Sequence, residues 1–424
     1  MNRQKAILIL LLALSLGTPE SLLGQRMSFD APEGVGLSAE KLDLATDMLR
    51  SHVEQGNIAG VVAAVARDGQ LVYFESLGMM DLDEARPMRD NALFRMYSMT
   101  RQITSAAVLH LYQQGAFQFD DPIKMYLPDF ADQRVLLDPN STDISQTRAR
   151  LGDITVAHLL THTSGLGSRS SALYREHKVR DKNISLDEMV KNAATVPLFH
   201  DPGSHFRYGI HATILGKLVE VWSGKPFEEY LQENILAPLG MNDTMFWAEG
   251  VDAQRLAAVY RPTDGRLLPH QIETVPWTMR PRLIEGGVGL LSSVMDFVHF
   301  SQMVLDRGQF AGSEILAPEV VDLMYQNAVP EQAMPIGEQG YWRGSGWTLG
   351  GFNLVMDSTA YEYPQYPMSN GTIWWDGSAG TAYFIDPNED MVIVIMAQVS
   401  PSRGGGFREQ FKQLVDEAII DHRD

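Results

Sequence analysis

The 424-residue chain contains no cysteine, and this absence removes several kinds of chemistry at once. Disulfides, thiolate metal sites and cysteine catalysis are all excluded. A His-Glu-x-x-His sequence is absent too, and the 11 histidines are scattered, so a zinc hydrolase has no support. No Gly-x-Ser-x-Gly sequence occurs, which argues against the serine of an α/β-hydrolase. We expect neither a metal nor a cofactor.

Basic residues are scarce relative to acidic ones. Lys and Arg total 34 against 53 Asp and Glu, which gives a formal net charge of −19. Such an excess of negative charge argues against nucleic-acid binding and mainly serves solubility. The hydrophobic content of 45% is ample for a core, and no repeat or low-complexity segment stands out. The length allows two or three average domains or a single large α/β enzyme domain.

The N-terminus carries the features of an exported protein. A basic start is followed by an apolar run from Ala6 to Leu16. This pattern is typical of a secretory signal peptide, because a membrane span needs about 20 apolar residues. Gln25 stands where a lipoprotein would have its modified cysteine, so lipidation there is excluded. We predict a signal peptide over 1–24, a bacterial periplasmic or secreted location, and no stable membrane insertion after cleavage. An uncleaved anchor is the alternative.

Periodicity predicts secondary structure at both ends of the chain. After a linker over 25–37, apolar residues recur at helical spacing from Ser38 onward. Asp68-Gly69 between two apolar runs is a strong hairpin signal, because both central residues need positive φ. Three β-rich segments and a closing helix are predicted near the C-terminus, at 372–375, 381–385, 391–396 and 407–420.

Strands at both ends with helices between them indicate one mixed sheet that the two termini complete. We therefore expect a single domain over 38–424 with two lobes. The sheet lobe should comprise about 38–97 and 290–424, and a mostly helical lobe about 98–289.

Ser98 lies where a turn of small polar residues runs into a long apolar-periodic helix. A serine in such a place is commonly an N-cap, whose side chain accepts a hydrogen bond from the first turn. The alternative is a nucleophile, because a helix N-terminus offers N–H donors and a positive dipole end to a developing anion. The serine alone does not decide between these interpretations.

Three separated stretches together resemble one family. Ser98-Met99-Thr100-Arg101 is similar to the Ser-x-x-Lys signature of serine β-lactamases and penicillin-binding proteins. Tyr208, after Pro202-Gly203-x-x-Phe206, resembles the tyrosine of the second motif. Trp375-Asp376-Gly377 resembles the third, which is Lys-Thr-Gly in β-lactamases and Trp-Gly-Gly in related esterases. Segments typical of class C β-lactamase-like hydrolases, which include the family VIII carboxylesterases, occur at 158–166, 238–241 and 286–290.

The resemblance runs from about residue 38 to 420 and implies a β-lactamase/transpeptidase-like fold of the α/β (α+β) class. An antiparallel sheet would be flanked by helices. Ser98 would attack an acyl carbonyl and form an acyl-enzyme, while Tyr208 removes its proton as general base. The oxyanion would be held by the backbone N–H groups of Ser98 and Ser378. Residues that border the substrate would be Trp375, Asp376 and Gly377.

Arg101 departs from the family pattern, because a guanidinium cannot act as a base near neutral pH. It can still donate hydrogen bonds and favour the phenolate of Tyr208 through its charge. Our first hypothesis is that Tyr208 is the sole base and Arg101 supports it electrostatically. The competing hypothesis is a fold that has lost hydrolysis and kept a binding pocket.

The third motif also bears on the substrate. β-Lactamases meet the carboxylate of a β-lactam with a lysine, where this chain has Trp375 followed by Asp376. An uncharged small ester is therefore favoured over a β-lactam or a peptidoglycan stem peptide, although an amide hydrolase of the β-lactamase or D-alanyl peptidase type stays an alternative. Asp376 could instead pair with Arg101 and neutralise it. The oligomeric state cannot be predicted.

Several other residues allow two interpretations. His162 is expected to be structural, bonding or packing within its turn. His205 and His211 lie three residues on either side of Tyr208, and either is an alternative base for the serine. Trp342, Trp347, Trp374 and Trp375 could line an acyl pocket, but aromatic residues at strand spacing more often belong to the core.

Overall fold

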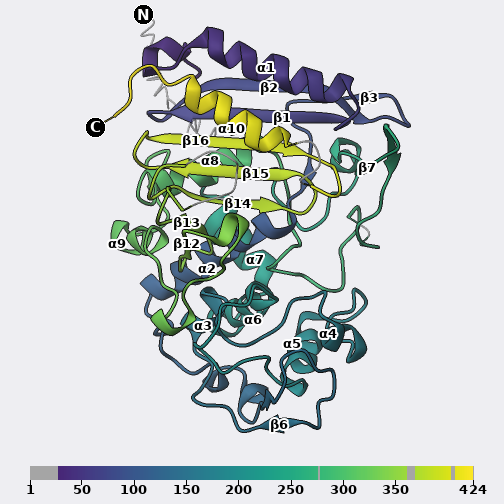
Figure 1. The fold of residues 1–424 in the computed structure, drawn as a ribbon, viewed down its shortest axis with the longest axis vertical. Helices are drawn as coiled ribbons and strands as arrows, with labels where there is room; N and C mark the ends of the chain where they lie inside the picture. Colours follow the sequence, from purple (N-terminus) through teal and green to yellow (C-terminus); the bar gives the residue numbers. More distant parts are fainter. Residues whose placement is uncertain (1–26, 276, 361–367, 403–405, 424) are drawn as a thin grey trace, which may run out of the picture.

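The computed structural model describes residues 27–275, 277–360, 368–402 and 406–423 (Figure 1). The predicted signal peptide over 1–24 lies outside them. No helix in these ranges has the length and apolar character that a membrane span requires.

An eight-stranded antiparallel sheet, built from both ends of the chain, occupies one end of the molecule (Figure 1). Its spatial order is β12-β13-β14-β15-β16-β1-β2-β3. The N-terminal β1 pairs with the C-terminal β16, with Val61 opposite Ala397. The prediction of one sheet that both termini complete is confirmed, but its strand pairs are all antiparallel, so the expectation of a mixed sheet is wrong. The strands are β1 (Gly60–Arg67), β2 (Gln70–Asp81), β3 (Arg86–Pro87), β12 (Ser345–Trp347), β13 (Asn353–Val355), β14 (Ile373–Gly377), β15 (Thr381–Asp386) and β16 (Met391–Ala397).

Helices cover both faces of this sheet. Alternate residues of β1 belong to two apolar clusters, and the cluster that contains Val61 packs against α1 (Ala39–Glu54) and α10 (Phe407–Glu417). The cluster that contains Val62 packs against α2 (Thr100–Gln113) and α8 (Val294–Leu305). Because both faces are buried, the strand reads as a continuous apolar run rather than an alternating one.

The predicted elements at the two ends agree with the structure. The Ser38 side chain accepts a hydrogen bond from the backbone N–H of Lys41 and caps α1. Asp68 and Gly69 form the tight turn between β1 and β2 with φ of 55° and 70°. Three short strands of the described sheet, β3, β12 and β13, escaped prediction, because they have two or three residues each and lack a clear alternation.

The predicted linker over 25–37 is packed against the domain from residue 27 onward. Phe29 forms a β-bridge with Leu71, and Leu37 forms one with Ile419. Leu37 is fully buried in the cluster beneath α1 and α10. The linker prediction is therefore wrong for residues 27–37, because Phe29 pairs with β2 and Leu37 with the C-terminal end, and local composition does not reveal either contact.

The middle of the chain forms the helical end of the molecule (Figure 1). α2 is buried almost all round and connects this part to the sheet. Its other elements are α3 (Val156–Leu160), α4 (Ala172–Glu176), α5 (Leu186–Thr195), α6 (His211–Ser223), α7 (Phe227–Leu231) and the short ladder β5 (Val135–Leu136) with β6 (Thr147–Arg148). The remaining short elements are α9 (Pro318–Val321) and the ladders β4 (Phe94–Arg95) with β9 (Leu291–Ser292), β7 (Tyr260–Thr263) with β8 (Arg266–Pro269), and β10 (Gln309–Phe310) with β11 (Ser313–Glu314).

Candidate active site

Ser98 lies in a single 3₁₀ turn, η2 (Tyr97–Met99), that leads directly into α2. The residue at the N-cap position of α2 is Met99, and no side chain caps the helix. The N-cap interpretation of Ser98 is therefore wrong. Among the described residues the half-buried Ser98 hydroxyl has no hydrogen-bond partner. Tyr97 just before it has a φ of 45°, an uncommon conformation for a bulky side chain that marks functional sites.

Gly377 brings the end of β14 against the backbone that precedes Ser98. A Cβ atom at this position would collide with the carbonyl oxygen of Met96 and with the Thr381 hydroxyl. The glycine is thus required by contact within the protein, where we had expected close approach to a substrate. Ser378 follows directly, on the strand end that packs against η2. Its place agrees with the predicted oxyanion role, which stays a prediction.

Arg101 is one turn along α2 from Ser98 and almost completely buried. Its Nη1 donates a hydrogen bond of 2.9 Å to the carbonyl oxygen of Gly209. Its Cζ lies 4.3 Å from the centroid of the Tyr208 ring. Burial lowers the pKa of Arg101, and the nearby Tyr208 opposes this effect. The structure therefore brings the arginine and the candidate base together.

Trp375 contacts Tyr208 rather than an open cleft. Its indole Nε1 donates a 2.9 Å hydrogen bond to the phenolic oxygen of Tyr208. The Tyr208 ring also packs against His162, Trp342 and Trp347, with centroid separations of 4.7, 6.2 and 5.7 Å. Trp375 and Trp347 are buried, as the core interpretation expects, but they enclose the tyrosine of the second motif.

Ser98, Arg101 and Tyr208 line one cavity of about 130 Å³. The first two come from one helix start and the third from the loop before α6, so the fold unites two of the three motifs at this cavity. The residues that line it are Ser98, Arg101, Ser168, Arg169, Tyr208, Gly209, Ile210, Thr213, Glu285, Gly287 and Val288. The third motif is connected to this cavity through the hydrogen bond from Trp375 to Tyr208.

Asp376 pairs with an arginine of α10 and not with Arg101. Its Oδ2 lies 3.3 Å from Nη1 of the buried Arg408. The hypothesis that Asp376 neutralises Arg101 is therefore wrong. Side chains of adjacent strand residues point to opposite faces of the sheet, so Trp375 faces Tyr208 while Asp376 is directed toward α10.

The histidines near Tyr208 are bonded to other residues of the protein. His162 and His211 are buried with their Nδ1 atoms 2.8 Å apart. Burial lowers the pKa of His162 well below its usual range, and burial together with the charge of Arg101 lowers that of His211 to about 3. Both are therefore neutral near pH 7. His205 bonds Ser204 and stacks on His200 at 4.1 Å. Neither alternative base lines the cavity.

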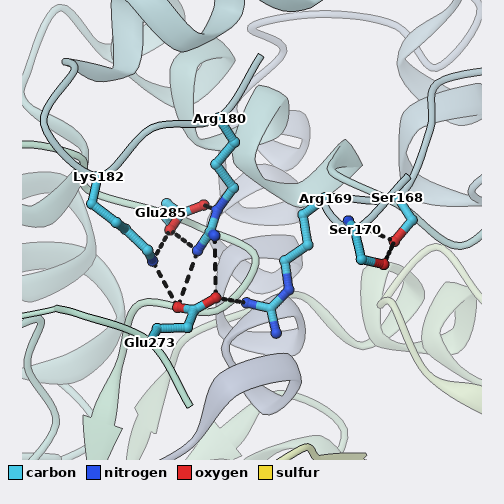
Figure 2. A network of polar contacts seen from close by, with 7 residues as sticks. All are labelled: Ser168, Arg169, Ser170, Arg180, Lys182, Glu273 and Glu285. Carbon is cyan, nitrogen blue, oxygen red and sulfur yellow. Dashed lines mark hydrogen bonds and ion pairs between the residues drawn. The ribbon is translucent and has the colours of Figure 1, made fainter. Parts of the chain in front are cut away.

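A network of ion pairs reaches the cavity through Arg169 and Glu285 (Figure 2). Glu285 bonds Arg180 at 2.5 Å and Lys182 at 2.9 Å. Glu273 bonds the same two cations at 3.1 and 2.8 Å, and Arg169 at 2.7 Å. Burial alone would raise the pKa of Glu285, but Arg180 and Lys182 lower it to about 2. Sequence reasoning missed these residues, because they come from separate loops with no local motif.

A second cavity of about 220 Å³ adjoins the first and shares Glu285 and Val288 with it. Its wall is mixed, with apolar side chains and three cations. The apolar members are Phe246, Val275, Trp277, Leu283 and Val288, and the cations are Lys182, Arg280 and Arg282. Across the described ranges, no three His, Asp or Glu side chains gather as a metal site would require.

The chain is similar to known proteins in sequence and in fold. A family described as Beta-lactamase matches residues 45–416. Esterase EstB of Burkholderia gladioli is 28% identical over 85% of this chain and 91% of its own. A monacolin J acid methylbutanoyltransferase of Aspergillus terreus is 30% identical over 69% of this chain and 72% of its own. The structure of EstCE1, a hydrolase with promiscuous acyltransferase activity, has a TM-score of 0.76 at 24% identity, covering 89% of this chain and 98% of that one.

Proposed function

Because the chain belongs to the β-lactamase family and has its fold, we propose that it hydrolyses small carboxylic esters through an acyl-Ser98 intermediate. One observation carries the proposal: Ser98, Arg101 and Tyr208 converge on a single cavity. A nucleophile, a proton acceptor and a fixed charge at one cavity are the parts that acyl transfer needs.

The reaction proceeds in two balanced halves. The Ser98 oxygen attacks the ester carbonyl carbon while its proton passes to the Tyr208 phenolate. The backbone N–H groups of Ser98 and Ser378 hold the oxyanion that forms. Collapse of this intermediate expels the alcohol, which takes the proton from Tyr208. Water then attacks the acyl-enzyme, gives its proton to Tyr208, and releases the acid as Ser98 recovers a proton.

Two contacts position Tyr208 in this site. The positive charge of Arg101 lies beside the ring, and the Trp375 indole donates to the phenolic oxygen. A positioned proton acceptor is what general-base catalysis requires. In the proposed reaction Tyr208 alone accepts the serine proton, since Arg101 cannot act as a base in place of the neutral lysine of the family pattern.

The third motif favours an ester over a β-lactam. It offers no lysine for a β-lactam carboxylate, because Trp375 is occupied with Tyr208 and Asp376 is paired with Arg408. The printed name of the relative EstB also points to esters. We place the reaction outside the cytoplasm, on the basic and apolar N-terminus. N-terminal sequencing of the protein from culture medium and periplasm tests that location.

The direct test is an assay with p-nitrophenyl acetate and butyrate, with intact mass spectrometry, on wild type, Ser98→Ala and Arg101→Lys. We expect a burst and an acyl adduct in wild type and neither in Ser98→Ala. Silence of all three folded proteins would contradict the ester hydrolase.

A catalytically silent binding protein is the second candidate, favoured by the permanent charge of Arg101 at the position of the family's base. It predicts a silent wild type, with hydrolysis appearing in Arg101→Lys because a buried lysine can lose its proton. The same assay therefore separates the two functions.

A further inference from the structure

We propose that Arg169 forms a subsite for a carboxylate on the acyl group of the substrate, which narrows the proposed ester hydrolysis and rests on it. Arg169 lines the cavity that contains Ser98. Among the described residues its only hydrogen-bond partner is Glu273, which its Nη1 atom contacts at 2.7 Å. Figure 2 shows the other end of the guanidinium turned away from that carboxylate. Its side chain is 27% exposed, so these N–H groups remain accessible.

The cavity wall carries more positive than negative charge. Two cations, Arg101 and Arg169, line the cavity with the single carboxylate of Glu285, which already bonds Arg180 and Lys182. This excess is unusual in a chain whose formal net charge is −19. A local excess of positive charge raises the local concentration of negatively charged ligands, even when the protein as a whole is negative.

The charges of Arg101 and Arg169 repel each other. Burial is the main reason that the pKa of Arg101 is lowered, and the charge of Arg169 lowers it further. The charges of Arg180 and Lys182 are instead neutralised within the protein, because each of these cations bonds both Glu273 and Glu285. A ligand carboxylate in the cavity would relieve the repulsion between Arg101 and Arg169.

The guanidinium of Arg169 is held in place before any ligand arrives. Glu273 fixes one edge, and Glu273 is itself fixed by Arg180 and Lys182. The Tyr97 ring lies on another side, with its centroid 5.7 Å from Cζ of Arg169. Because Tyr97 directly precedes Ser98, the subsite is tied to the backbone of the nucleophile. A preorganised fork of N–H donors is suited to a carboxylate.

This subsite changes the expected acyl group but not the argument against β-lactams. That argument concerns β14, where Trp375 stands at the family's lysine position and the acid Asp376 follows it. Arg169 belongs to a different segment, the loop between α3 and α4. The inferred substrates are therefore esters of short dicarboxylic acids, in which one carboxyl group is esterified and the other is free.

The test compares p-nitrophenyl monoglutarate with p-nitrophenyl pentanoate, which match in chain length and differ in the terminal charge. Rates are corrected for the background measured with Ser98→Ala. We expect wild type to favour the monoglutarate in kcat/KM, and Arg169→Gln to reduce that preference about 10- to 100-fold, the size of one charge-assisted hydrogen bond. Arg169→Lys should keep an intermediate preference. Arg307→Gln, which removes an exposed arginine that lines neither cavity, should leave the preference unchanged.

Binding separates this inference from the proposed function. Calorimetry of glutarate with the Ser98→Ala protein should give a Kd that Arg169→Gln, added to it, weakens about tenfold or more. If wild type hydrolyses neither ester but this binding effect is found, the hydrolase proposal fails and the subsite stands. A substrate preference and a glutarate Kd that are both insensitive to Arg169→Gln and Arg169→Lys would overturn the subsite. Thermal unfolding of each variant shows whether it is folded. If Arg169→Gln has a folding defect, the substrate preference and the glutarate Kd of Arg169→Lys test the subsite in its place.

Discussion

Two buried arginines beside the same cavity have opposite surroundings. Arg101 contacts the Gly209 carbonyl and the Tyr208 ring, and no carboxylate pairs with it among the described residues. Arg180 bonds the carboxylates of both Glu273 and Glu285. Burial lowers the pKa of both arginines, but the two glutamates reverse the effect at Arg180 and raise its pKa. Burial alone therefore does not determine what a charged side chain does.

The difference separates a structural charge from one that acts on the reaction. The positive charge of Arg180 is neutralised by two carboxylates, and these ion pairs hold two loops together. Its electrostatic effect on a ligand in the cavity is therefore small. At Arg101 the charge is unmatched, and its Nε has no hydrogen-bond partner among the described residues. Such an arrangement is unfavourable for folding, and proteins retain it where the field of the charge serves a site. Each prediction below changes one side of this comparison.

Replacement of Tyr208 should have the largest effect. Tyr208→Phe keeps the ring beside Arg101 but removes the proton acceptor, so kcat for an active ester should fall about 10²- to 10⁴-fold. Steady-state and burst kinetics with p-nitrophenyl butyrate measure this. An undiminished rate would mean that another group, such as the buried His211, takes the serine proton.

Loss of Glu285 should be the largest change in stability. Glu285→Gln leaves Arg180 and Lys182 with one carboxylate in place of two, and removal of one partner from a buried ion pair costs about 3–5 kcal/mol. Urea unfolding followed by tryptophan fluorescence measures the free energy of unfolding. The exposed pair of Lys225 and Glu233 provides the control, because Glu233→Gln should change it by about 0–1 kcal/mol. Equal effects would contradict the structural role of the network.

The stabilisation from Glu285 should disappear in acid. Its folded pKa of about 2 lies below the ordinary value of 4.5, so it stabilises the fold above about pH 4.5 and loses this effect as the pH falls toward 2. The pKa difference corresponds to about 3 kcal/mol. We expect the difference in unfolding free energy between wild type and Glu285→Gln to shrink between pH 5 and pH 2.5. A difference independent of pH would show that lost packing, not charge, explains the variant.

Sequence patterns predicted the parts of this site that depend on local geometry. Ser98 and Arg101 share a helix face by their spacing. Gly377 does allow a close approach, but of the Met96 backbone and not of a substrate. The sheet followed from strand patterns at the two termini. These features depend on spacing within one segment or on a few strongly patterned ones.

The remaining features depend on contacts between segments without a joint pattern. Trp375 was expected to border the substrate, and its bond to Tyr208 became visible only when β14 and the loop before α6 were placed together. Asp376 was a candidate partner of Arg101 until the register of β14 directed it to Arg408. The ion pairs of Glu285 join residues about a hundred positions apart along the chain, as with Arg180. The pattern within a single segment of the sequence does not predict such a pair.

A smaller effect is expected at Trp375. Trp375→Phe keeps an aromatic ring but removes the hydrogen bond that holds the Tyr208 oxygen, so the proton acceptor is less well oriented. We expect kcat for p-nitrophenyl butyrate to fall about tenfold. Steady-state kinetics measure it. Trp374→Phe is the matched control, because Trp374 donates to Asn353 and belongs to the cluster on the opposite face of the sheet. Equal kcat values for the two variants would reduce Trp375 to a packing residue.

The smallest expected change is in the stability of Arg101→Met, and it tests the comparison most directly. Because no carboxylate depends on Arg101, its replacement by an apolar side chain of similar length removes a buried charge without orphaning an ion, and the Gly209 carbonyl loses one hydrogen bond. The unfolding free energy should therefore change by less than about 1 kcal/mol or increase, while ester hydrolysis is largely lost. Arg180→Met should instead destabilise the protein strongly, since it leaves Glu273 and Glu285 short of a cation. Equal destabilisation by both variants would show that Arg101 is as structural as Arg180, and the assignment of its charge to Tyr208 would fail.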